Sequence, residues 1–91
     1  MQDFLFQDDI YLCPLRVAAG VRNKLLEAMA CAMPVVTTRL GAEGLNVQHG
    51  REVLFAETPD EFSQSVQKLM ASPELRKHLG QNGRQYVLKY H

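Results

Sequence analysis

The sequence has no long apolar run, no excess charge and only two cysteines. No stretch approaches the roughly 20 apolar residues that a membrane-spanning helix needs. Ten basic and ten acidic residues cancel, so charge gives no reason to expect binding to nucleic acid or to an anionic membrane. No signal-peptide pattern follows Met1, and we therefore expect a cytoplasmic protein.

Few residues are suited to holding a metal. Cys13 and Cys31 lie in segments that we expect to be buried, and their spacing fits no metal motif. Two reduced thiols are the expected state, with a disulfide as the alternative. The three histidines, His49, His78 and His91, are scattered in polar surroundings, so we expect them at the surface. The sequence predicts no metal site and no cofactor.

What the sequence does contain is enough apolar material for one small core: 46% of its 91 residues are hydrophobic. Residues 10–13, closed by Pro14, predict a buried strand, and β-branched residues 35–38 predict a second. Residues 52–56 predict a third short strand. Residues 1–9 have a mixed pattern that fits either a segment covering the core or a turn of helix.

Three helices are predicted between and after these strands. In the first, Asn23 is the expected N-cap, the periodic pattern runs from Lys24, and Pro34 ends the helix. Its expected buried face carries Leu25, Met29 and Ala32.

The two remaining helices both follow the third strand. Thr58 as N-cap with Glu61 three residues later predicts a capping box, and residues 72–74 start the last helix in a similar way. Gly80 and Gly83 lower the helix propensity in the middle of that helix. The residues expected on its buried side are Leu75, Leu79, Tyr86 and Tyr90.

This order of elements predicts an α/β fold, namely a partial Rossmann-like domain. Its parallel sheet has about three strands, with flanking helices and two C-terminal helices. Strands that are apolar throughout need cover on both faces. Because three strands make a very small sheet of this kind, we expect residues 1–91 to be the C-terminal portion of a larger domain. The absent strands would leave an apolar sheet edge that invites self-association.

The stretch from residue 20 to residue 36 has the chemistry of a ligand site. A strand that leads through a glycine loop into a helix places unpaired backbone N–H groups at the carboxyl edge of the sheet, where they favour an anion. Arg22 and Lys24 flank this helix start and are suited to neutralising phosphate charge. Glu27, about one turn further on, is placed to accept hydrogen bonds from sugar hydroxyls.

The loop after the second strand opens at the same edge, which makes Arg39 and Glu43 candidate cleft residues. Simpler explanations stay open for the whole site. A glutamate near a helix start is favoured by the helix dipole alone, so Glu27 need not bind anything. Gly20 can serve only to turn the chain, and exposed basic side chains are often just solvated.

The segment PLRVAAGVRNKLLEAMACAMPVVTTRLGAEGL (residues 14–45) resembles the C-terminal half of GT-B glycosyltransferases with the family-four type of donor site. The later segments GREVLFAETPDEFSQSVQKLM and SPELRKHLGQNGRQYV fit the same family. The resemblance covers residues 10–91. It is closest to a bacterial subgroup of sugar transferases linked to exopolysaccharide and exosortase gene clusters, in which a similar PLR…G…NK…EAMA pattern occurs.

The resemblance implies two Rossmann-like domains that face a cleft, with a nucleotide-diphosphate sugar held by the C-terminal one. Many members of the family are metal-independent and retain the anomeric configuration. Glu27 matches the second glutamate of the family's paired-glutamate motif, which binds the ribose hydroxyls. The residues that match the pyrophosphate-binding segment are Gly20, Val21, Arg22, Asn23 and Lys24.

The sequence departs from the family pattern at Ala19, where the first motif glutamate is expected. That glutamate usually helps to hold the donor sugar, so the identity of the sugar stays open; Asn23 and Lys24 are candidates to compensate. The family's acceptor domain and the first strands of its donor domain have no counterpart here. We therefore expect the isolated chain to be inactive in transfer.

The predicted function is the nucleotide-sugar-binding part of a glycosyltransferase that acts on a glycan or a lipid-linked acceptor. The full enzyme would be cytoplasmic or peripheral to a membrane. The alternative is a non-catalytic α/β interaction module, which Ala19 and the short chain favour. A receiver-like domain is disfavoured, because Asp8 and Asp9 precede the first strand instead of following strand ends.

Overall fold

The computed structural model describes residues 5–7, 10–13 and 22–90. Its strands form one sheet in the order β1-β2-β3-β4, in which β2, β3 and β4 are parallel and β1 runs antiparallel to β2. The predicted α/β fold with three parallel strands is confirmed. β1 adds an edge strand at residues 5–7, where the sequence predicted either core cover or a turn of helix. The elements are β1 (Leu5–Gln7), β2 (Ile10–Cys13), α1 (Arg22–Ala30), β3 (Val35–Thr37), β4 (Leu54–Phe55), α2 (Pro59–Ala71) and α3 (Pro73–Tyr90).

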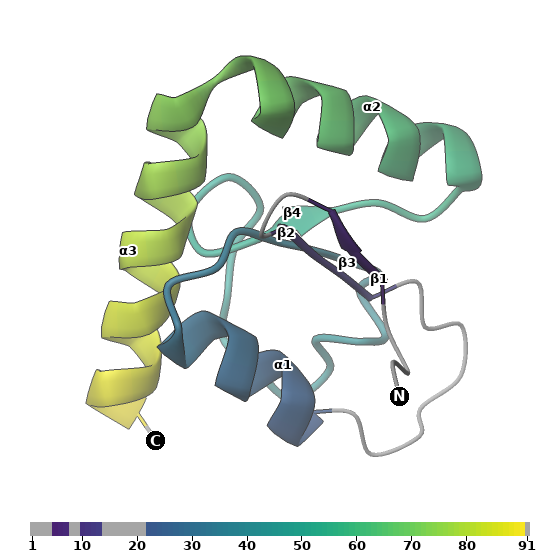
Figure 1. Cartoon of the computed structure of the whole chain (residues 1–91). Coiled ribbons are helices and arrows are strands. Elements are labelled where there is room, and N and C mark those ends of the chain that lie inside the picture. The colour runs from purple at the N-terminus through teal and green to yellow at the C-terminus, as the bar shows by residue number, and fades with distance from the viewer. Residues whose placement is uncertain (1–4, 8–9, 14–21, 91) are drawn as a thin grey trace.

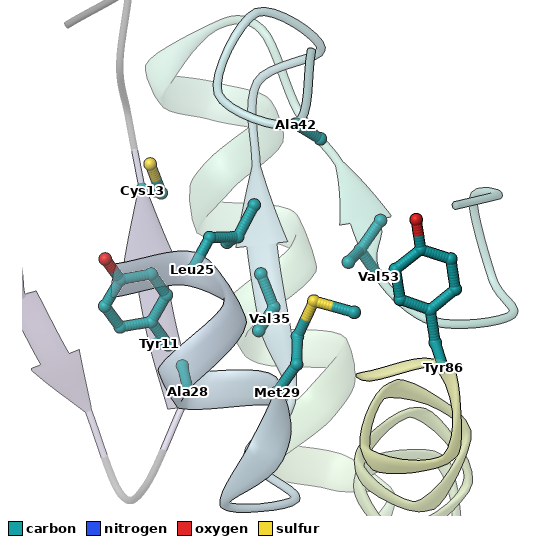
Figure 2. Packing of buried hydrophobic residues seen from close by; sticks show 9 residues of the cluster. All are labelled: Tyr11, Cys13, Leu25, Ala28, Met29, Val35, Ala42, Val53 and Tyr86. Carbon is teal, nitrogen blue, oxygen red and sulfur yellow. The ribbon is translucent and has the colours of Figure 1, made fainter. Parts of the chain in front are cut away.

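The sheet is covered on both faces, as its apolar strands require. Figure 1 shows α1 and α2 on opposite faces of the sheet, with α3 running along its side past both layers. Alternation along β2 sends Tyr11 and Cys13 toward α1, where Leu25 and Met29 are fully buried (Figure 2). The second cluster, which involves α2 and α3, contains Ile10, Val36, Leu54, Ala56, Leu69 and Leu79.

Neither outer edge of the parallel strands is left fully open. The sequence predicted an open apolar edge at the first parallel strand, β2. β1 occupies that edge, because Leu5 is paired with Leu12 and Gln7 with Ile10. At the other edge, the N–H of Phe55 in β4 donates to Nδ1 of His49 (2.9 Å). The predicted open edge at β2 is therefore covered by β1, and self-association through a sheet edge stays a prediction.

Helix α1 differs from its predicted bounds at both ends. It begins at Arg22, so Asn23 lies inside the first turn and is not the N-cap that the sequence predicted. It ends at Ala30, four residues before Pro34. The proline therefore follows the helix without ending it, and a backbone turn terminates the helix instead.

That turn is a Schellman motif. The N–H of Ala32 donates to the carbonyl of Met29 (2.9 Å), and the N–H of Met33 donates to the carbonyl of Ala28 (3.1 Å). Ala32 has a φ of 61°, in the left-handed region that glycine usually occupies at this position. The motif turns the chain directly from α1 into β3.

The predicted caps of the last two helices are confirmed. Thr58 Oγ1 accepts the N–H of Glu61 (3.1 Å), and Ser72 Oγ accepts the N–H of Leu75 (3.1 Å). The first cap differs from an ideal capping box in one hydrogen bond. The Glu61 side chain would ideally accept the N–H of the N-cap Thr58, but its Oε1 accepts the N–H of Glu57 (2.6 Å), one residue earlier.

Two residues that were expected to be buried are exposed. Tyr90 is 57% exposed, since it lies at the last turn of α3, whereas Leu79 and Tyr86 on the same helix are buried as predicted. Cys31 is exposed because α1 ends before it, while Cys13 is buried in the sheet, and both thiols are free.

Candidate functional site

The candidate site lies at the carboxyl edge of the three parallel strands. β2, β3 and β4 end at Cys13, Thr37 and Phe55, so the segments that follow them leave the sheet on the same side. Helix α1 comes after β2 in the chain and returns to the start of β3, so its first turn belongs to this edge too (Figure 1). Gly20 and Val21, which we predicted to contact a pyrophosphate, lie outside the described residues.

A tight turn closes the end of β3. The N–H of Gly41 donates to Thr38 Oγ1 (3.0 Å), and the N–H of Thr38 donates to the carbonyl of Cys13 (3.2 Å). A Cβ at Gly41 would lie 2.5 Å from Thr37 Oγ1, so the turn has no room for a side chain there. Because both threonines are buried, the turn fixes where the loop leaves the sheet.

Arg39 leaves this turn at the edge of the sheet and is anchored twice. Its backbone N–H donates to Glu57 Oε2 (2.9 Å), and its guanidinium carbon lies 4.7 Å from the ring centroid of Phe55. These two contacts connect the ends of β3 and β4. They hold the positively charged guanidinium of Arg39 at this edge of the sheet. Glu43, the second predicted cleft residue, is exposed a few residues further along the same loop.

The sequence prediction missed Glu57. Its carboxylate accepts the Arg39 N–H, while its own N–H donates to Glu61 at the start of α2. The sequence does contain a signal for Glu57. This residue directly follows the predicted strand 52–56, and the ends of parallel strands meet at one edge of the sheet, so Glu57 must lie at the same edge as the loop that begins with Arg39.

On α1 the exposed and buried faces are clearly separated. Leu25, Ala28 and Met29 are buried against the sheet, while Lys24 and Glu27, three residues apart, are exposed on one outward face. Lys24 and Glu27 are therefore free to meet a ligand that approaches the start of the helix from outside the sheet.

The start of α1 has the electrostatic character expected of an anion site. Its first turn contains no acidic residue, and its opening N–H groups have no partners within the helix. Arg22 and Asn23 belong to this turn by their backbone, but their side chains are outside the described part of the structure. The helix start and Glu27 thus lie about one turn apart on the same element.

No group of three or more histidine, cysteine, aspartate or glutamate side chains suited to a metal occurs within residues 5–7, 10–13 and 22–90. His49 and His78 are exposed as predicted, and His91 lies outside these residues. His49 has a structural contact through its bond to Phe55. Among the helices that the structure describes, none is long and apolar enough to cross a membrane.

The fold and this edge define an α/β domain of the kind that binds ligands beyond the carboxyl ends of its parallel strands. The family model for glycosyl transferases group 1 matches residues 1–72, and the chain belongs to this family.

Curated relatives agree with the family. The chain is 39% identical over 67 residues to an uncharacterized glycosyltransferase of Methanocaldococcus jannaschii, and 31% identical over 75 residues to glycosyltransferase 1 domain-containing protein 1 of Xenopus tropicalis. These matches cover 71% and 82% of this chain but 19% and 22% of those proteins, so the chain spans about a fifth of their length. It is also 35% identical over 57 residues, 63% of this chain and 15% of the relative, to an uncharacterized 44.6 kDa protein in the cps region of Klebsiella pneumoniae.

Solved structures place the fold within the same family. The C-terminal domain of a glycosyl transferase group 1 family protein from Francisella tularensis superimposes with a TM-score of 0.82 at 25% identity, over 90% of this chain and 43% of that chain. Sucrose-phosphate synthase from Thermosynechococcus elongatus gives a TM-score of 0.74 at 25% identity, over 89% of this chain and 21% of that chain. The chain therefore has the fold of a C-terminal domain of a group 1 glycosyltransferase.

Proposed function

We propose that this chain is the C-terminal portion of a glycosyltransferase donor-binding domain and holds part of a nucleotide-diphosphate sugar. The pyrophosphate would lie at the start of α1, against the backbone of residues 20–24, and Glu27 would accept hydrogen bonds from the ribose hydroxyls. The observation that carries this proposal is the exposure of Glu27, about one turn beyond an acid-free helix start at the carboxyl edge of the sheet.

The strand-end residues extend the proposed site. Arg39, held on Phe55 and by Glu57, would present its positive charge to the cleft side of the bound donor. Glu43 would lie at the outer rim of the same cleft. No metal is required by this arrangement, because the helix start and the basic residues supply the positive potential.

The full activity is proposed as sugar transfer to a glycan or a lipid-linked acceptor, in an enzyme that also contains an acceptor domain. Exopolysaccharide synthesis is the proposed setting, and the name of the Klebsiella pneumoniae relative, which places that protein in a cps region, is consistent with it. Since the chain spans about a fifth of its curated relatives, we expect it to bind donor without transferring sugar by itself.

Replacing Glu27 with alanine is the direct test of the site. The 91-residue chain would be titrated by calorimetry with UDP-, GDP- and ADP-sugars. We expect about a tenfold or larger loss of affinity for the donor that binds, since hydrogen bonds to a charged group contribute about 1.5–3 kcal/mol each. Glu27 is exposed, so its replacement leaves the core intact.

The matched control is Glu74→Ala, which removes an exposed carboxylate from the first turn of another helix, α3. It should leave donor affinity unchanged. Equal affinity of wild type and Glu27→Ala would remove Glu27 from the site. Failure of every nucleotide sugar to bind the wild-type chain would favour the alternative function, a non-catalytic interaction module.

A further inference from the structure

A second hollow lies away from the candidate donor site. A groove of about 290 Å³ runs between the segment that leads into β4 and the last turns of α3. Glu52, which lines it, lies two residues before β4, whereas Phe55 ends that strand and Glu57 follows it. The groove is thus at the amino-terminal edge of the sheet, opposite the edge that carries Arg39.

Hydrogen bonds across the groove fix its two walls relative to each other. The hydroxyl of Tyr86 accepts the N–H of Asn46 (2.9 Å), and Asn82 Nδ2 donates to the carbonyl of Arg51 (2.9 Å). Glu52 Oε1 accepts the N–H of Gln48 (2.9 Å) within the loop. Tyr86 and Glu52 are both buried, so the groove is formed in advance of any ligand.

The charges in the groove largely cancel. The Nε of Arg51 donates to the buried carboxylate of Glu52, and its Nη2 donates to the carbonyl of Asn46 (3.3 Å). Lys89 supplies the remaining charge, with its Nζ 5.4 Å from the ring centroid of Tyr90. Because the guanidinium is already engaged by a carboxylate, the groove is poorly suited to a phosphate or another strong anion.

The groove instead offers an aromatic surface surrounded by amides. Tyr90 is 57% exposed and lies against Tyr86, with ring centroids 5.0 Å apart and the rings tilted by 44°. Asn46, Asn82 and Gln85 line the same hollow, and their side-chain amides carry both donors and acceptors.

This combination suits a neutral sugar. A pyranose ring has an apolar C–H face that packs on an aromatic ring and a rim of hydroxyls that exchange hydrogen bonds with amides. We propose that this groove is a glycan-binding site that holds one or two neutral sugar residues, separate from the donor site. The proposal rests on the groove alone and does not depend on whether Glu27 binds a nucleotide sugar.

The test is a titration of the ¹⁵N-labelled 91-residue chain with maltotriose, cellotriose and mannotriose, followed by amide chemical shifts. At least one trisaccharide should cause saturable shifts at Asn46 and Arg51 and at the side-chain amides of Asn82 and Gln85. Tyr90→Ala should weaken that binding about fivefold or more, because it removes the exposed aromatic surface. The control is Leu88→Ala, since Leu88 is 71% exposed on the same helix and does not line the groove.

Three results would overturn the proposal. These are the absence of saturable shifts with all three sugars, saturation by inorganic phosphate in their place, and equal affinity of Tyr90→Ala and wild type. Because Tyr90 is largely outside the core, its variant should keep the wild-type pattern of amide shifts elsewhere. Glu27→Ala should leave trisaccharide affinity unchanged, so that this proposal and the donor-site proposal can fail independently.

Discussion

Gly80→Ala is expected to lower the free energy of unfolding by roughly 2–3 kcal/mol, a large part of the stability of a domain of this size. A Cβ at this position would lie 2.2 Å from the carbonyl oxygen of Ala32 and 3.0 Å from its carbonyl carbon. Both atoms belong to the backbone of the Schellman motif that ends α1, so they cannot move without breaking its hydrogen bonds to Ala28 and Met29. Urea unfolding followed by circular dichroism would measure the loss.

Gly83→Ala is the matched control, one turn further along the same helix. A Cβ there would lie 3.5 Å from the Cβ and Cγ of Met29, which is an ordinary contact. Since alanine is favoured over glycine inside a helix by about 1 kcal/mol, this variant should be as stable as the wild type or slightly more so. If Gly80→Ala were also neutral, the close approach of α3 to the end of α1 would be wrong.

Leu25→Ala is expected to cost about 2–5 kcal/mol, as is typical for a fully buried leucine. Leu25 has no exposed surface and packs between α1 and the sheet with Tyr11 and Val35 (Figure 2). The loss combines the removed apolar contacts with the cavity that remains, because the sheet beneath it cannot collapse. Thermal and urea unfolding of the purified variant would measure it.

The neighbouring Leu26 provides the comparison, because the same substitution on the same helix differs only in burial. Leu26 is half-buried at the margin of the cluster, so Leu26→Ala should cost clearly less, about 1 kcal/mol. Equal losses from the two variants would contradict the orientation of α1 on the sheet, and with it the outward direction assigned to Glu27.

Some of the fold could be predicted because the signals are local. The β-branched run at residues 35–38 and the apolar run closed by Pro14 identified β3 and β2, and the caps at Thr58 and Ser72 fixed the starts of α2 and α3. Each of these depends on the conformational preferences of a few consecutive residues. The exposure of Glu27 has a local cause too. It lies two residues from the buried Leu25 and Met29, which places it on the opposite face of α1.

Other features could not be predicted, because they depend on contacts between distant segments. Helix propensity marked Gly80 as a weak point, whereas the structure shows it as the place where two helices meet. Helical spacing placed Tyr90 on the buried side, yet the sheet and α1 do not extend far enough to cover it. Glu57 was missed because its partner, Arg39, lies 18 residues away in the chain.

The sequence by itself determined the order of the elements, the parallel sheet with cover on both faces, and the family resemblance that the comparisons confirmed at the level of group 1 glycosyltransferases. These follow from apolar periodicity, turn residues and caps, which act over a few residues. Only the tertiary structure decided the antiparallel β1 edge, the contact of α3 with the end of α1, the hydrogen bond from the backbone N–H of Arg39 to Glu57 and the groove beside Tyr90. The physical reason is that each of these depends on how closely separate segments approach one another, and the packing of the whole chain sets those distances.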